Sequence, residues 1–150
     1  METGLRHRLK RVARQISDQH RHLRTIYAEL ADALAGSELA PDARERFAYY
    51  REAIEAHFAL ESDTFFPALH GLRADLGAAL EALDREHGQL RAVLARLEHR
   101  IIVGSGDAAA RVLAEFATQL RDHEAREEEL LSALGEDELG GRMPPSRTSG

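Results

Sequence analysis

Apolar residues recur every three or four positions in four long stretches of the chain, which is the spacing of amphipathic helices. The predicted helices cover about residues 5–34, 41–67, 76–103 and 107–134. Glycine follows three of these stretches, at Gly36, Gly104 and Gly135, and Pro67 is expected to end the other. Asp107 is the expected N-cap of the last helix. Strand-like alternation is absent, so the pattern predicts an all-α protein.

Helices of this length, joined by short connections, favour an antiparallel, up-down-up-down four-helix bundle. The chain has 150 residues, which is a usual size for one domain. We therefore assign residues 1–134 to a single bundle. Residues 135–150 are rich in glycine, proline and serine and are expected to form a disordered tail.

Six polar residues occupy positions where the helical period requires a core residue. They are His20, His57, Glu61, His87, His123 and Glu127. In the second and fourth helices a histidine is followed four residues later by a glutamate, so both side chains lie on one face. Three other histidines fall outside the apolar faces, namely His7, His22 and His99, and Glu124 is expected to lie on a solvated acidic face. The sequence thus places four imidazoles and two carboxylates inside the bundle.

This combination of buried residues indicates a metal site. A lone histidine on an apolar face is usually a satisfied core residue, but burying uncompensated carboxylates costs several kcal/mol each. A pair of divalent cations would offset that cost. The chain has no cysteine, so any metal must be held by imidazole and carboxylate. Such ligands suit iron, manganese, cobalt and zinc.

The net charge of −6, from 26 acidic and 20 basic residues, disfavours nucleic acid or an anionic membrane as a partner. No stretch is long and apolar enough for a membrane span, and the first residues lack the apolar core of a secretory signal. The expected location is therefore cytoplasmic. The sequence identifies no protein partner.

Four segments carry a resemblance to a known family. They read SDQHRHL at residues 17–23, HFALE at 57–61, EHGQL at 86–90 and HEAREE at 123–128. In the order and spacing of their histidines and glutamates, they resemble the hemerythrin-like, His-His-Glu cation-binding proteins. The resemblance implies two iron ions inside the bundle with a bridging oxo or hydroxo group.

The same resemblance implies a role for each of the six buried polar residues. Two histidines would bind one iron, two would bind the other, and both glutamates would bridge the ions. The implied sets are His20 with His57, His87 with His123, and the bridging Glu61 with Glu127.

The chain departs from the oxygen-carrying members of this family at two positions. Those proteins have a further histidine one turn after the ligand of the third helix, where this chain has Arg91. They also bridge through a carboxylate five residues past the histidine of the fourth helix, where Glu128 stands. We favour Glu127, at four residues, because it shares the apolar face with His123. Asp84, Glu128 or water could fill the position that Arg91 leaves open.

The expected function is that of a di-iron protein that binds, senses or reacts with oxygen, nitric oxide or peroxide, or that senses iron. Two alternatives stay open: a di-iron peroxidase or oxidase, and a non-catalytic interaction module that a metal such as zinc stabilises. We favour a metal- and oxygen-binding protein over a dedicated enzyme. Because Arg91 replaces the carriers' additional histidine, we expect that the protein reacts with oxygen irreversibly, or senses it, and does not carry it.

Overall fold

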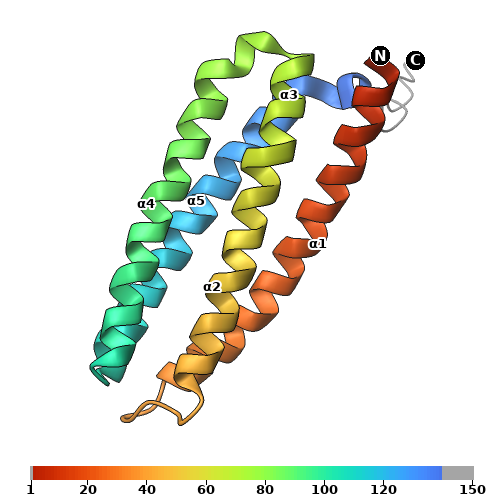
Figure 1. The fold of residues 1–150 in the computed structure, drawn as a ribbon. Helices are drawn as coiled ribbons and strands as arrows, with labels where there is room; N and C mark the ends of the chain where they lie inside the picture. Colours follow the sequence, from red (N-terminus) through yellow and green to blue (C-terminus); the bar gives the residue numbers. More distant parts are fainter. Residues whose placement is uncertain (1, 140–150) are drawn as a thin grey trace, which may run out of the picture.

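The protein folds into a bundle of four long helices, which confirms the predicted all-α architecture (Figure 1). The computed structural model describes the backbone of residues 2–139 and the side chains of residues 4–132. In chain order the elements are α1 (Glu2–Leu34), α2 (Ala43–Leu60), η1 (Glu61–Phe65), α3 (Phe66–Leu72), η2 (Ala74–Leu76), α4 (Gly77–Ile102) and α5 (Gly106–Leu139). Element η1 is a π-helix and η2 is a short 3₁₀-helix.

The long helices α1, α2, α4 and α5 alternate in direction, as the predicted up-down-up-down topology requires (Figure 1). Helix α1 packs against α2 and α5, and α4 packs against the same two helices. Every long helix therefore lies antiparallel to both of its neighbours. Among the described helices, none is both long and apolar enough to cross a membrane.

The sequence predicts that the second helix stops at Pro67, and this prediction is wrong. Helical backbone continues from α2 through η1 and α3 as far as Leu72 (Figure 1). The π-helix explains the difference, because its wider turn lets the N–H of Phe66 donate to the carbonyl of Glu61, five residues earlier. Pro67 then lies in the first turn of α3, where its missing N–H is not needed.

The last helix also differs from the prediction at both ends. Helix α5 begins at Gly106, so Asp107 lies in its first turn instead of capping it. It continues through Leu139, and Gly135 lies within it. A single glycine costs only about 1 kcal/mol in a helix interior, which is too little to end a helix by itself. The rest of the predicted disordered tail, residues 140–150, lies outside the described residues.

Two clusters of buried apolar side chains fill the bundle, and a polar layer separates them. The lower core, next to the connection between α1 and α2, includes Leu23, Leu30, Tyr50, Ile54, Phe58, Leu90, Leu97, Leu113 and Phe116. The upper core, next to α3, consists of Leu9, Val12, Ile16, Phe65, Phe66, Ala68, Leu69, Leu80 and Leu83. Five of the six predicted ligands fall between these two clusters along their helices, and His57 directly precedes Phe58, the last lower-core residue of α2.

Gly88 in α4 follows a predicted ligand but makes no room for the site. It is exposed, and a Cβ at this position would meet no atom within 4 Å. We therefore expect Gly88→Ala to stabilise the protein by about 1 kcal/mol, because alanine loses less backbone entropy in a helix. Metal content should stay unchanged. Thermal unfolding and elemental analysis of the variant test this expectation.

Gly104→Ala is the matched control for that substitution. The backbone of Gly104 has a φ of 77°, a conformation that strains any residue with a Cβ. This variant should therefore be less stable than the parent. If Gly88→Ala lost metal instead, the assignment of Gly88 to the open surface of α4 would be wrong.

Candidate metal site

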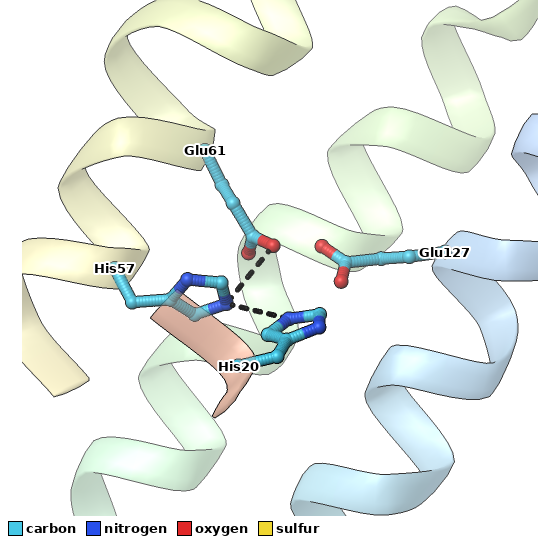
Figure 2. A group of neighbouring side chains, drawn as sticks. All are labelled: His20, His57, Glu61 and Glu127. Atoms are coloured by element: carbon cyan, nitrogen blue, oxygen red, sulfur yellow. Dashed lines mark hydrogen bonds and ion pairs between the residues drawn. The ribbon is translucent and has the colours of Figure 1, made fainter. Parts of the chain in front are cut away.

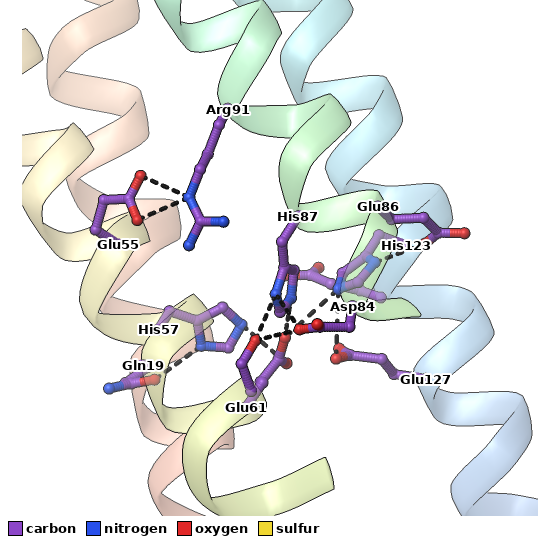
Figure 3. A network of polar contacts seen from close by, with 12 residues as sticks. Gln19, Glu55, His57, Glu61, Asp84, Glu86, His87, Arg91, His123 and Glu127 are labelled. Atoms are coloured by element: carbon purple, nitrogen blue, oxygen red, sulfur yellow. Dashed lines mark hydrogen bonds and ion pairs between the residues drawn. The ribbon is translucent and has the colours of Figure 1, made fainter. Parts of the chain in front are cut away.

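The structure brings the six predicted ligands together at one level of the bundle (Figures 2 and 3). Their side chains come from every long helix and from η1: His20 from α1, His57 from α2, Glu61 from η1, His87 from α4, and His123 and Glu127 from α5. Five of the six residues are at most 5% exposed, whereas the side chain of His20 is 18% exposed. This proximity is what the predicted site requires, and ligation of a metal stays a prediction.

The carboxylate of Glu61 lies at the centre of the group. Its Oε2 is 3.2 Å from Nε2 of His57. Its Oε1 is 2.8 Å from Nε2 of His87 and 3.5 Å from Nε2 of His123. Glu61 therefore presents its two oxygens to different histidines, which is the arrangement expected of a carboxylate that bridges two cations.

The donor atoms form two groups, in each of which they lie within 4.8 Å of one another. The first group is His20, His57, Glu61 and Glu127, and the second is Glu61, His87 and His123. Nε2 of His20 is 3.3 Å from Nε2 of His57. Oε2 of Glu127 is 3.4 Å from Nε2 of His123, so Glu127 faces both groups. Two ligands about 2.1 Å from one metal lie about 3 Å apart at a right angle, so these spacings suit two neighbouring ions.

Two buried carboxylate oxygens in the group have no hydrogen-bond partner among the described residues. They are Oε2 of Glu61 and Oε2 of Glu127. A buried oxygen without a donor is strongly unfavourable, and a cation between these carboxylates would satisfy both. Four imidazoles with two carboxylates also form a donor set that divalent first-row metals prefer. The residues present therefore fit a metal site.

Burial and crowding shift the ionisation of the cluster when no metal is bound. Burial and the neighbouring Glu61 raise the pKa of Glu127 to about 9. Burial and the nearby His57 lower the pKa of His20 to about 4. Burial opposes charge on His123, but the nearby carboxylates of Glu127 and Glu61 outweigh it and raise the pKa of His123 to about 10. Hydrogen bonds from histidines likewise outweigh burial at Glu61 and hold its pKa well below the usual range.

The outward-facing nitrogens of two histidines are held by residues that were not predicted (Figure 3). Nδ1 of His57 donates to Oε1 of Gln19 at 2.8 Å. Nδ1 of His123 donates to Oε1 of Glu86 at 2.6 Å, and Glu86 also accepts from Nε of Arg126 at 2.7 Å. Donation through Nδ1 turns the lone pair of Nε2 toward the cluster, which is the tautomer that a metal requires.

His87 is held on its outward side by a serine and an aspartate. Its Nδ1 lies 3.0 Å from Oγ of Ser62, and that hydroxyl donates to Asp84. Oδ1 of Asp84 is 3.6 Å from the same ring nitrogen, so this carboxylate faces the side of His87 away from the cluster. In this structure Asp84 is therefore an outer partner and does not occupy a ligand position.

Glu128 is exposed, and Glu127 carries the inward carboxylate of α5; ligation by Glu127 stays a prediction. The three histidines predicted to lie off the apolar faces are also exposed: His7, His22 and His99. The helical period thus separated the buried histidines from the surface ones along the described chain.

Arg91 is paired with Glu55, outside the cluster (Figure 3). Its Nε donates to both carboxylate oxygens of Glu55, at 2.9 Å each. Its guanidinium carbon lies 5.3 Å from the centre of the Phe58 ring, which stacks in turn on the ring of His87. Arg91 therefore packs on the aromatic ring that supports His87, and it places no nitrogen among the ligands.

A cavity of about 440 Å³ opens beside His20. Its walls include Tyr27, Tyr50 and Leu120. Glu124 also lines it and lies 3.3 Å from Nε2 of His20 through its Oε2, so the prediction of a solvated position for Glu124 is wrong. Burial raises the pKa of this carboxyl above its ordinary value. The cavity gives a small molecule a route to the His20 side of the cluster.

Comparison with known families assigns the chain independently of this geometry. The family model described as the hemerythrin HHE cation binding domain matches residues 11–134. The match reaches into all four long helices and includes all six predicted ligands. No curated protein and no solved structure gives a significant match. A four-helix bundle, a buried cluster of histidines and glutamates and this match together show that the chain belongs to the hemerythrin family of HHE cation-binding domains.

Proposed function

We propose that the buried cluster binds two metal ions and that these ions are iron. The observation that carries the proposal is the central position of Glu61, whose oxygens face different histidines and include one buried atom without a hydrogen-bond partner. Membership in a cation-binding family supports a metal, and the resemblance to hemerythrin-like proteins supports iron and its pairing. The proposed ligand sets are His20 with His57, His87 with His123, and Glu61 with Glu127 between them.

A pair of ferrous ions would supply electrons for the reduction of oxygen, peroxide or nitric oxide. The residues of the chain provide the surroundings of that chemistry. The upper and lower cores exclude water from two sides, and the outer hydrogen bonds orient the imidazoles. The cavity beside His20 admits a small molecule. We therefore propose that the protein binds, senses or reacts with such a ligand.

Reconstitution with ferrous iron should give about two ions per chain, since two carboxylates and four imidazoles exceed the needs of one ion. His57→Ala should lower this number, because His57 is buried in the cluster. His22→Ala is the matched control, because His22 is exposed on α1 and contacts Tyr49 at the surface. Elemental analysis supplies the measurement. One ion per chain in excess iron, or equal losses in both variants, would contradict the proposal.

Reaction with oxygen should be irreversible. The oxygen carriers of the family have a histidine at the position of Arg91, and here that side chain is bound to Glu55 and contributes no ligand. The position stays open to water or to a second ligand, which favours lasting oxidation of the metal. The test is to load iron anaerobically, admit oxygen and remove it by vacuum over several cycles. A visible spectrum that changes and recovers fully in each cycle would identify a carrier instead.

Oxidation of a small organic molecule is a second candidate function, favoured by the size of the cavity beside His20. Its volume of about 440 Å³ is far larger than a diatomic ligand needs, since a water molecule in the liquid takes about 30 Å³. Turnover assays with peroxide and a phenolic reductant would distinguish this activity from simple binding. Multiple turnovers that disappear in His57→Ala would favour the enzyme.

A further inference from the structure

The two halves of the proposed metal site differ in the residues that hold their histidines from outside. Glu86, a carboxylate fixed by Arg126, accepts from His123, and the pair of Ser62 and Asp84 holds His87. Carboxylate partners of this kind make an imidazole a stronger donor to a metal and fix its orientation. The half that contains His87 and His123 is therefore supported by anionic groups.

The half that contains His20 and His57 has weaker outside support. His57 donates to Gln19, whose amide carries no charge. Within residues 4–132, no hydrogen-bond partner holds Nδ1 of His20. Nε2 of His20, the nitrogen that faces the cluster, also has an alternative partner in Glu124 at 3.3 Å. A metal at this half must therefore compete with Glu124 for Nε2 of His20.

The packing of the histidines also differs between the two halves, and it too favours the half that contains His87 and His123. The ring of His87 stacks between Phe58 and Phe66, with ring centres 4.1 Å and 5.8 Å away. Both His87 and His123 have side chains that are 1% exposed. His20 is 18% exposed, lines the cavity and contacts the ring of His57 edge-on, with ring centres 4.8 Å apart. A rigid, dry set of ligands holds a metal more tightly than a mobile, hydrated one.

We infer that the two metal positions are unequal, and this inference rests on the proposed function. The position of His87 and His123 fills first and retains its ion. The position of His20 and His57 fills second and exchanges its ion through the cavity. The shared carboxylates of Glu61 and Glu127 serve both positions, so the difference originates in the histidines and their surroundings. Over a range of free metal concentrations, the protein exists with one ion and then with two.

The test is an anaerobic titration of the metal-free protein with Co²⁺, followed by calorimetry and by visible absorption. We expect two binding steps whose dissociation constants differ about tenfold or more. His20→Ala should abolish the weaker step and leave the tighter one. Glu86→Gln should weaken the tighter step by about 10- to 100-fold, because it removes the charged partner of His123. Gln19→Ala should weaken only the weaker step.

Glu115→Gln is the matched control for Glu86→Gln, because Glu115 also pairs with an arginine, Arg96, but touches no histidine of the cluster. It should leave both steps unchanged. Melting of each metal-free variant shows that it is folded, and His20→Ala tests the inference even if Glu86→Gln does not fold. Simultaneous binding of both ions, or an effect of Glu86→Gln confined to the weaker step, would overturn the inference. Absence of any Co²⁺ binding would instead contradict the proposed function.

Discussion

Glu61→Gln should abolish binding at both metal positions, with affinities that fall by more than about 100-fold. Loss of an outer partner alone costs about 10- to 100-fold in affinity, and Glu61 faces the histidines of both positions directly. Glutamine keeps the size of the side chain but removes its negative charge. The glutamine amide would present one oxygen and one NH₂ group to histidine nitrogens that are arranged around a carboxylate. Glu61 belongs to both groups of donor atoms.

Elemental analysis after reconstitution with ferrous iron measures the effect, and Glu55→Gln provides the matched control. Glu55 lies on the preceding turns of the same helix, but its carboxylate pairs with Arg91 outside the cluster. This control should bind about two ions per chain. Glu127→Gln adds a second variant in the cluster that replaces a carboxyl whose pKa is already raised to about 9. Retention of two ions in Glu61→Gln would show that Glu61 does not bridge.

Removal of the metal should lower the melting temperature by roughly 8–16 °C at neutral pH. A ligand that binds only the folded state, at a thousandfold excess over its dissociation constant, contributes about 4 kcal/mol. In a domain of this size, each kcal/mol corresponds to roughly 2–4 °C. Thermal unfolding before and after chelation measures the difference. An unchanged melting temperature would place the metal outside the core.

The metal-free protein should also become less stable as the pH rises from about 6.5 to 8.5. The pKa of Glu127 is raised from 4.5 to about 9 and that of His123 from 6.5 to about 10. The folded chain therefore keeps protons that the unfolded chain has released, and this stabilisation is lost as the pH rises through the folded pKa values. The pKa values of His20 and Glu61 are lowered, so their contributions are lost only at lower pH.

The metal-loaded protein should not show this decline, because bound cations take the place of those protons. The difference in melting temperature between loaded and metal-free protein should consequently be larger at pH 8.5 than at pH 6.5. Glu127→Gln should reduce the pH dependence of the metal-free protein, since it removes one of the two groups responsible. A metal-free protein that is more stable at pH 8.5 than at pH 6.5 would contradict these proton positions.

Helical periodicity was sufficient to predict the bundle and the clustering of the candidate ligands. A polar residue that falls at the helical spacing of the apolar residues faces the same side of the helix as they do. The side chains of His20, His57 and His87 could therefore be placed inside the bundle from spacing alone. The end of the second helix could not be predicted in this way. A π-helix changes the hydrogen-bond spacing by one residue, and Pro67 looks the same in sequence whether it ends a helix or begins a new turn.

The outer partners of the histidines were missed for a different reason. Gln19 and Glu86 each stand one residue before a candidate ligand, yet each holds a histidine of a neighbouring helix. The pattern of residues along one helix does not reveal which helix lies beside it or how far each helix is rotated about its own axis. Glu124 was assigned to a solvated face for the same reason, and it lines the cavity beside His20 because α1 and α5 are neighbours.

The ligands of each proposed position come from three separate elements. The first position draws on α1, on the continuous helix of α2 and η1, and on α5, and the second draws on η1, α4 and α5. A partly folded chain that has joined only two neighbouring helices holds no complete position. Metal therefore cannot speed the early steps of folding, and it acts on a bundle that has already closed. Its effect should fall on the rate of unfolding, so the loaded protein gains lifetime rather than folding speed.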